Sequence, residues 1–150
     1  MKNMKRLLPS LVIALAAMFF GIAAYITIGE QPARLALPDG PMLAEWKISV
    51  RIGTAIQATL AVVTGILALI TWRVLRNWRW AFGGLVILAN WPWTLSMIAP
   101  INSSLAAMTV ETAGPGTRAL IQQWGQLHSM RTGFGLAALL VFIWANSRGK

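Results

Sequence analysis

Trp124, His128 and Arg131 are the residues best suited to chemistry, because they follow one another at spacings of four and three. These spacings place side chains on one face of a helix. An imidazole can act as a general base, and a nearby guanidinium can stabilise the anion that proton removal creates. Neighbouring arginines would favour a neutral imidazole, whereas contact with Glu30 would favour the protonated form. A hydrogen-bonded structural histidine is the alternative interpretation.

Two other spacings bring polar side chains towards the same place. Glu30 and Arg34 are four residues apart, so they can form an ion pair that either closes the end of a helical bundle or belongs to a site. Arg51, Thr54 and Gln57 are three apart and share one broad side of a helix. A glutamine within a membrane needs a partner, and both interhelical contact and ligand contact satisfy this need.

Asn90, Trp91 and Asn102 complete the predicted site. Pro92 removes a backbone donor and predicts a kink, where tryptophans would suit either a flat aromatic guest or ordinary packing. Pro100 is expected to end that helix just before Asn102. We predict that Glu30, Arg51, Asn102, His128 and Arg131 converge on one cavity, with Trp124 as a wall. The catalytic candidates are His128, Arg131 and Glu30. The ligand-binding candidates are Arg34, Arg51, Gln57, Asn90, Trp91, Asn102 and Trp124.

The elements that position these residues are membrane helices, because 57% of the 150 residues are hydrophobic and only 11% are charged. A span needs about 20 apolar residues. Four segments meet this need, at about residues 7–29, 49–74, 79–99 and 117–146. We predict an all-α fold in one integral membrane domain, residues 1–150, as an antiparallel four-helix transmembrane bundle. Its first apolar run is longer than a signal peptide core, which favours a span.

The connection between the first two spans is predicted to be partly helical and to cover one end of the bundle. Pro32 is expected to end or bend the first helix at Glu30. The sequence Pro38-Asp39-Gly40-Pro41 is typical of a turn and predicts a break before the second helix.

Charge is divided between the two ends of this bundle. The acidic side chains and the histidine, namely Glu30, Asp39, Glu45, Glu111 and His128, are expected in the two connections at one end. Eight of the thirteen lysines and arginines fall at the other end, which predicts a cell membrane protein with both termini in the cytoplasm. Topology and anionic lipids account for the net charge of +9 without nucleic acid.

Tryptophans are expected to mark the membrane interfaces. Trp72, Trp78, Trp80 and Trp144 fall at the end with the termini, and Trp46 precedes the second helix at the other end. The chain has no cysteine, which excludes disulfides and thiolate metal sites. One histidine with few carboxylates makes neither a metal shell nor a pair of haem ligands. We expect no metal and no cofactor.

Several of these motifs together resemble one family. Glu30-Gln31-Pro32-Ala33-Arg34-Leu35, Asn90-Trp91-Pro92, Pro100-Ile101-Asn102 and the Trp124, His128, Arg131 pattern are similar to anthrone oxygenase-like proteins, which are small four-helix membrane proteins mostly of unknown function. The resemblance runs from about residue 21 to residue 144. It implies oxidation of anthrones to anthraquinones without flavin or haem, at a site with Asn102, Trp124, His128 and Arg131. The segment from Glu30 to Leu35 resembles a subgroup whose substrates are not defined.

Two kinds of function remain open at this stage. The first is a cofactor-independent membrane monooxygenase or oxidoreductase acting on a lipophilic aromatic or quinol-like molecule. The second is a non-catalytic protein that binds lipid, quinone or a small anion, or a helical subunit of a larger membrane complex. Expected partners are membrane lipids and a lipophilic small molecule, with a homo-oligomer or a partner membrane protein left open.

The predicted orientation can be tested by cysteine labelling in intact cells. Asn77→Cys should be protected from an impermeant maleimide, because the connection with Asn77 is expected in the cytoplasm. Glu111→Cys should react from outside. Equal labelling of the two positions from outside would overturn the topology.

Overall fold

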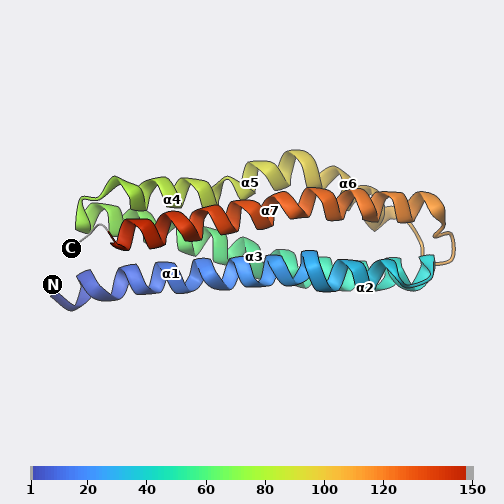
Figure 1. Ribbon diagram of the computed structural model, residues 1–150. Helices are drawn as coiled ribbons and strands as arrows, with labels where there is room; N and C mark the ends of the chain where they lie inside the picture. The colour runs from blue at the N-terminus through green and yellow to red at the C-terminus, as the bar shows by residue number, and fades with distance from the viewer. Residues whose placement is uncertain (1, 148–150) are drawn as a thin grey trace.

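Four long helices lie side by side and form the whole fold (Figure 1). The computed structural model describes residues 2–147. Its elements are, in order, α1 (Lys2–Tyr25), the π-helix η1 (Ile26–Glu30), α2 (Gln31–Leu35), α3 (Asp39–Leu75), α4 (Trp78–Leu88), α5 (Asn90–Trp93), the π-helix η2 (Thr94–Ile98), α6 (Ala99–Ala107) and α7 (Pro115–Ser147). The predicted all-α four-helix bundle is confirmed.

Each long helix is apolar enough to cross a membrane, and the four ranges within the described residues are Leu7–Leu35, Asp39–Leu75, Trp78–Ala107 and Pro115–Ser147. These are the properties of a multi-pass membrane protein. The helices are longer than the predicted spans. With 37 residues, α3 is about 55 Å long at a rise of about 1.5 Å per residue, whereas the hydrocarbon core is about 30 Å thick. Each helix therefore extends beyond the hydrocarbon.

Pro32 and Pro100 do not end their helices, although the sequence predicted an end or a bend at Pro32 and an end at Pro100. The first span continues past Glu30 to Leu35, and the third continues past Pro100 to Ala107. In both, the residue before the proline donates its N–H five residues back, from Gln31 to Ile26 and from Ala99 to Thr94. This π turn widens the helix directly before the proline ring, which would otherwise meet the carbonyl four residues back.

The expected turn before the second span is shorter than predicted. Pro38 is the N-cap of α3, so Asp39, Gly40 and Pro41 form the first turn of that helix. A proline is tolerated in a first turn because its missing N–H would have no helical partner there. The connection from Glu30 to Glu45 is partly helical, as predicted, but α2 continues the line of α1 and α3 begins at Asp39, so this segment prolongs two long helices rather than covering the end of the bundle (Figure 1).

Two apolar clusters hold the bundle together. One contains Val12, Ala16, Phe19, Ala61, Ala68, Trp80, Ile87, Ala138, Phe142 and Ala145. The other contains Ile26, Met42, Leu43, Trp46, Ile98, Ile101, Leu105, Ile121 and Trp124. The predicted interfacial positions of Trp80 and Trp46 are wrong, because both are 1% exposed within these clusters. Trp80 stacks on Phe142 with ring centroids 5.7 Å apart.

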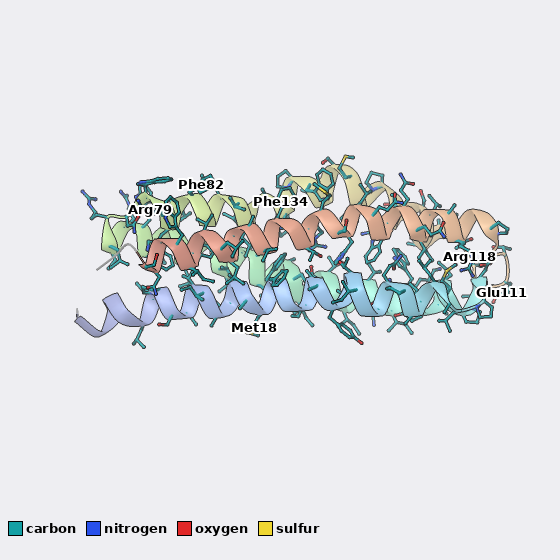
Figure 2. All side chains as sticks on the ribbon, viewed as in Figure 1. Met18, Arg79, Phe82, Glu111, Arg118 and Phe134 are labelled. Carbon is teal, nitrogen blue, oxygen red and sulfur yellow. The ribbon has the colours of Figure 1, made fainter. Side chains whose placement is uncertain are left out.

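The two ends of the bundle differ in charge, as predicted. We call the end with Arg73, Arg76 and Arg79 the basic end, and the end with Glu30, Asp39, Glu45 and Glu111 the acidic end. Arg79 lies at one extreme of the bundle and Glu111 and Arg118 at the other (Figure 2). Exposed Trp72, Trp78 and Trp144 surround the basic end, as expected of an interfacial belt. Arg148 and Lys150, two of the eight basic residues predicted for this end, lie outside the described residues.

Hydrogen bonds close both ends. Asn77 accepts a hydrogen bond from the backbone N–H of Arg79 at 3.2 Å, which caps α4 and fixes the short turn after α3. Arg118 pairs with Asp39 and donates to the carbonyls of Leu35 and Leu37, both at 2.7 Å. These contacts join the start of α7 to the chain before α3.

Helix packing at Gly83 provides a stability test. An alanine Cβ there would lie 2.4 Å from Cε1 of Phe142, a ring held against Trp80. Gly83→Ala should lower the free energy of unfolding by about 1–3 kcal/mol. Gly133→Ala is the matched control, because nothing lies within 4 Å of its Cβ position. Unfolding by denaturant in detergent micelles measures both, and equal stability of the two variants would contradict this packing.

Candidate functional site

A layer of buried polar side chains separates the two apolar clusters. Along each helix, its members lie between residues of the two clusters, on α3 at Gln57, on α5 at Asn90 and on α7 at His128 and Arg131. Their exposed fractions are 1%, 2%, 1% and 6%. We call these four residues the polar layer. Burying polar groups within a membrane span is costly, which marks such residues as functional candidates.

His128 was expected in a connection at the acidic end, and this position is wrong. The residue lies within α7 and is buried inside the bundle. Its ring stacks on Trp124 with centroids 5.0 Å apart and planes 23° apart. Its Nδ1 lies 3.3 Å from the hydroxyl of Thr27, which itself lies 2.9 Å from the carbonyl oxygen of Ala23. When Thr27 donates to that carbonyl, it accepts a hydrogen bond from Nδ1–H. The lone pair is then on Nε2, which can act as a base.

Arg131 is a buried cation without an acidic partner. No carboxylate of residues 2–147 lies within ion-pair distance of it, and its Nε has no hydrogen-bond partner there. An uncompensated buried charge costs several kcal/mol. The side chain lines two cavities, so a ligand that enters either one can supply the missing negative charge.

Arg34 is buried as deeply but has many partners. It forms ion pairs with Glu30 and Glu45, donates to Gln31 at 2.7 Å and to Ser49 at 2.6 Å, and lies over the ring of Trp124. The predicted contact between Glu30 and Arg34 is therefore present. Arg34 connects α2 to α3 and supports the Trp124 ring on which His128 stacks.

Three adjoining cavities border these residues on the side of α3. The outer cleft, of about 580 Å³, lies between α3 and α6 and is lined by Trp46, Lys47, Val50, Arg51, Thr54, Ala55, Asn102 and Ala106. The inner cavity, of about 210 Å³, is lined by Thr54, Gln57, Ala58, Ala61, Asn90, Trp91, Thr94, Leu95, Ala99, Asn102 and Arg131. The histidine pocket, of about 10 Å³, has room for about one water and is lined by Ile26, Glu30, Ser49, Val50, Gly53, Thr54, Gln57, Trp124, His128 and Arg131.

The predicted site residues are thus distributed over three cavities rather than one. The inner cavity has Gln57, Asn90, Trp91, Asn102 and Arg131 in its wall. The histidine pocket has Glu30, Trp124, His128, Gln57 and Arg131. Arg51 lines the outer cleft with Asn102, and Arg34 is not among the lining residues of these three.

Thr54 and Thr27 are absent from the predicted site. Thr54 lines all three cavities, and its spacing of three from Arg51 and from Gln57 was the signal that could have included it. Thr27 contacts His128 across 101 positions of the chain, and no local pattern predicts such a contact.

Several oxygen atoms in the inner cavity wall lack hydrogen-bond partners within the described chain. They are Gln57 Oε1, Asn90 Oδ1 and Asn102 Oδ1. The amide of Asn90 is fixed in orientation, because its Nδ2 donates to the carbonyl of Ile87 at 2.9 Å. The cavity therefore combines a cation, Arg131, with acceptors that an O–H donor would satisfy. Residues 2–147 contain no group of three or more side chains placed to hold a metal ion.

Comparison with known proteins identifies the family of this arrangement. Residues 46–141, which carry the polar layer, match the family model described as anthrone oxygenase. The chain belongs to the anthrone oxygenase family. It is 29% identical over 136 residues to the anthrone oxygenase dmxR16 of Cryptosporiopsis sp. (strain 8999), covering 85% of this chain and 78% of that protein. No solved structure matches the chain.

The family match begins at Trp46 and so leaves out most of the contacts around Arg34. Glu30, Gln31, Arg34 and Glu45 all precede it, as does Thr27, which contacts His128. Within this member of the anthrone oxygenase family, the first span and the start of α3 thus supply the support for Trp124 and His128, whereas the matched residues supply the cavities and the polar layer.

Replacement of Arg34 should reveal this supporting role. Arg34→Met leaves Glu30 and Glu45 without their cation, and the free energy of unfolding should fall by about 3 kcal/mol. Arg51→Met is the matched control, because Arg51 is exposed and has no ion-pair partner among the described residues. Its change should stay within about 0.5 kcal/mol. Denaturant unfolding in detergent decides, and equal losses would contradict the role of Arg34.

Proposed function

We propose that this protein is a membrane oxygenase that converts a flat, lipophilic, anthrone-like ketone into a quinone. His128 would be the general base, and Arg131 would stabilise the anion formed on the ketone oxygen. The observation that carries the proposal is the buried Arg131 without a carboxylate partner, in the wall of a cavity and one helical turn from a buried imidazole. Family membership and the name of the fungal relative support the same chemistry.

The reaction inserts one oxygen atom and releases water. His128 Nε2 removes a proton from the ring methylene, and the resulting anion, which is electron-rich, reacts with O2 to form a carbon–oxygen bond. His128 returns the proton to the peroxide. Loss of the second methylene hydrogen, together with the outer oxygen atom and a proton, gives water and the new carbonyl. Two hydrogens and one oxygen atom thus leave as water, and O2 is the only oxidant.

Charge stabilisation is the main contribution of Arg131 in this scheme. A preorganised cation in a site that excludes water stabilises a developing oxyanion far more than it would in solution. The histidine pocket adjoins the inner cavity, because Thr54, Gln57 and Arg131 line both, and this adjacency supports proton transfer between them. A general base can act directly or through one water, and the histidine pocket has space for about one.

The inner cavity also suits a ligand that arrives from the membrane. Trp91 and Leu95 in its wall are 42% and 61% exposed on the surface of a span. The unpaired oxygens of Gln57 and Asn90 would accept hydrogen bonds from hydroxyl groups on the ligand.

We further propose that the protein lies in the cell membrane with its basic end in the cytoplasm. A hydrocarbon core of about 20 helical residues that starts at the level of Trp72 ends near Ile52 on α3. The polar layer would then lie just inside the outer boundary, and the pairs of Arg34 would lie at the level of the lipid headgroups.

The proposal predicts the activity of two variants in lipid nanodiscs. His128→Ala should lower turnover of anthrone by about 100-fold, because the base is lost. Arg131→Gln should lower it by about 100-fold or more, because the oxyanion loses its cation. Gln126→Ala, on an exposed part of the same helix, is the control and should retain full turnover. Oxygen uptake and anthraquinone absorbance, corrected for autoxidation without protein, measure the rates.

Three measurements could contradict the proposed oxygenase or the roles of its residues. Wild-type protein that binds anthrone without consuming oxygen would reject the oxygenase and favour a non-catalytic binding protein. Equal turnover by wild type, His128→Ala and Arg131→Gln would remove both residues from the chemistry. Native mass spectrometry of molecules retained by the purified protein identifies what the cavity holds.

A further inference from the structure

The inner cavity is small for a complete ligand site. Its volume of about 210 Å³ is below the range of about 300–1,000 Å³ that is usual for small-molecule sites. The outer cleft, at about 580 Å³, is within that range. The two share Thr54 and Asn102 in their walls. The outer cleft thus adjoins the inner cavity and offers space for substituents of a ring system that reaches Arg131.

The charged residues of the outer cleft are all basic. Lys47 and Arg51 line it, and no acidic residue does. Lys47 donates to the backbone carbonyls of Ala106, at 3.1 Å, and Met108, and so holds the end of α6. Arg51 has neither an ion pair nor a hydrogen bond within the described chain, and Glu30 and Glu45 are both paired with Arg34. The charge of Arg51 is therefore available to a ligand.

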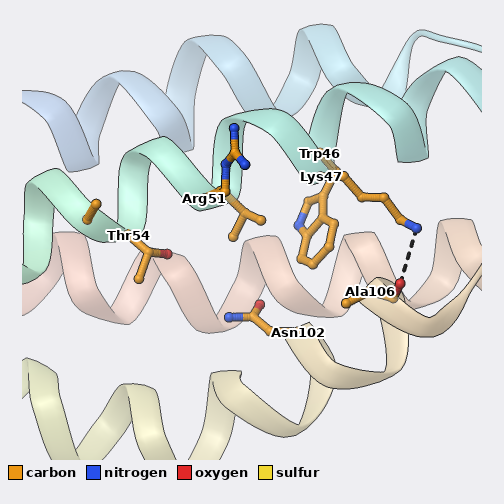
Figure 3. Close-up of a pocket in the computed structure, with 8 residues that line it drawn as sticks. Trp46, Lys47, Arg51, Thr54, Asn102 and Ala106 are labelled. Atoms are coloured by element: carbon orange, nitrogen blue, oxygen red, sulfur yellow. Dashed lines mark hydrogen bonds between the residues drawn. The ribbon is translucent and has the colours of Figure 1, made fainter.

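A hydrogen-bond donor in the same cleft also favours an anionic ligand. Trp46 is 1% exposed and lines the cleft, and its Nε1–H has no partner among the described residues. In Figure 3, Trp46 and Asn102 extend towards each other from opposite walls, Lys47 reaches to Ala106, and the guanidinium of Arg51 points away from Asn102. Arg51 has no hydrogen bond or ion pair within the described chain, so a rotation of its side chain towards the cleft breaks neither.

We propose that the outer cleft is a second subsite, which binds an anionic substituent, a carboxylate in particular, of the same ligand whose ring lies in the inner cavity. Arg51 provides the charge and Trp46 Nε1 an additional donor. The proposal rests on the proposed function for the position of the ring. It specifies the ligand class further, as a flat aromatic with an acidic group at the end opposite the oxygen that Arg131 binds.

Binding of two fluorescent probes to the full chain in phosphatidylcholine nanodiscs tests this subsite. Anthracenecarboxylate and anthracenemethanol have the same ring and differ in charge. Wild-type protein should bind the carboxylate more tightly. Arg51→Gln should weaken carboxylate binding about fivefold and change alcohol binding by less than about twofold. Arg51→Lys should restore most of the affinity, and high salt should reduce the preference for the carboxylate, since Arg51 is exposed.

Arg73→Gln, which removes one charge at the basic end, is the matched control and should leave carboxylate binding unchanged. Equal affinity of wild type for the two probes, or equal losses for Arg51→Gln and Arg73→Gln, would overturn the subsite. Displacement of the carboxylate probe when phosphatidylglycerol replaces part of the phosphatidylcholine would also overturn it, because the cleft would then hold a lipid headgroup. A separate anthrone oxidation assay on wild type tests the oxygenase itself, so either proposal can fail alone.

Discussion

A guanidinium buried in a membrane protein needs negative charge close by. The two buried arginines of this chain, Arg34 and Arg131, differ in whether the protein itself supplies that charge. Arg34 is surrounded by Glu30, Glu45, Gln31 and Ser49, so its charge is used within the structure. Arg131 has no such partner in the described chain and faces cavities. Burial makes both charges costly unless a negative group compensates them. Arg34 therefore stabilises the fold, and Arg131 is free to bind a ligand.

The polar layer is tolerable because apolar clusters enclose it on both sides. The cluster around Trp80 and Phe142 packs the basic end, and the cluster around Trp46 and Trp124 packs the acidic end. Between them, the third span is irregular at α5 and η2, and the inner cavity lies between this stretch and α3. The irregular span, rather than a loop, thus creates the space. A π turn next to a cavity is a frequent arrangement at functional sites.

Support for the candidate base comes from parts of the chain that are distant in sequence. Arg34 of α2 lies over Trp124, Trp124 stacks on His128, and Thr27 of η1 contacts the other side of the imidazole. Trp46 of α3 meets Trp124 edge to face at 6.3 Å. These contacts fix the ring plane of His128 and favour one tautomer. They also link the outer cleft, through Trp46, to the support of the base.

Hydropathy, helical spacing and the distribution of charge were sufficient to predict the class, the four spans, the acidic end and the shared face of Trp124, His128 and Arg131, because these are properties of one helix at a time. Local rules failed at Pro32 and Pro100, where a π turn absorbs the proline, and at Trp46 and Trp80, which packing buries. The spacing of four predicted the pair of Arg34 with Glu30, but only the tertiary structure decided that Glu45 also pairs with Arg34 and that Arg131 has no carboxylate partner in the described chain. The Thr27 contact of His128 and the division of the site into three cavities likewise depend on how four helices pack, and no pattern within one helix contains that information.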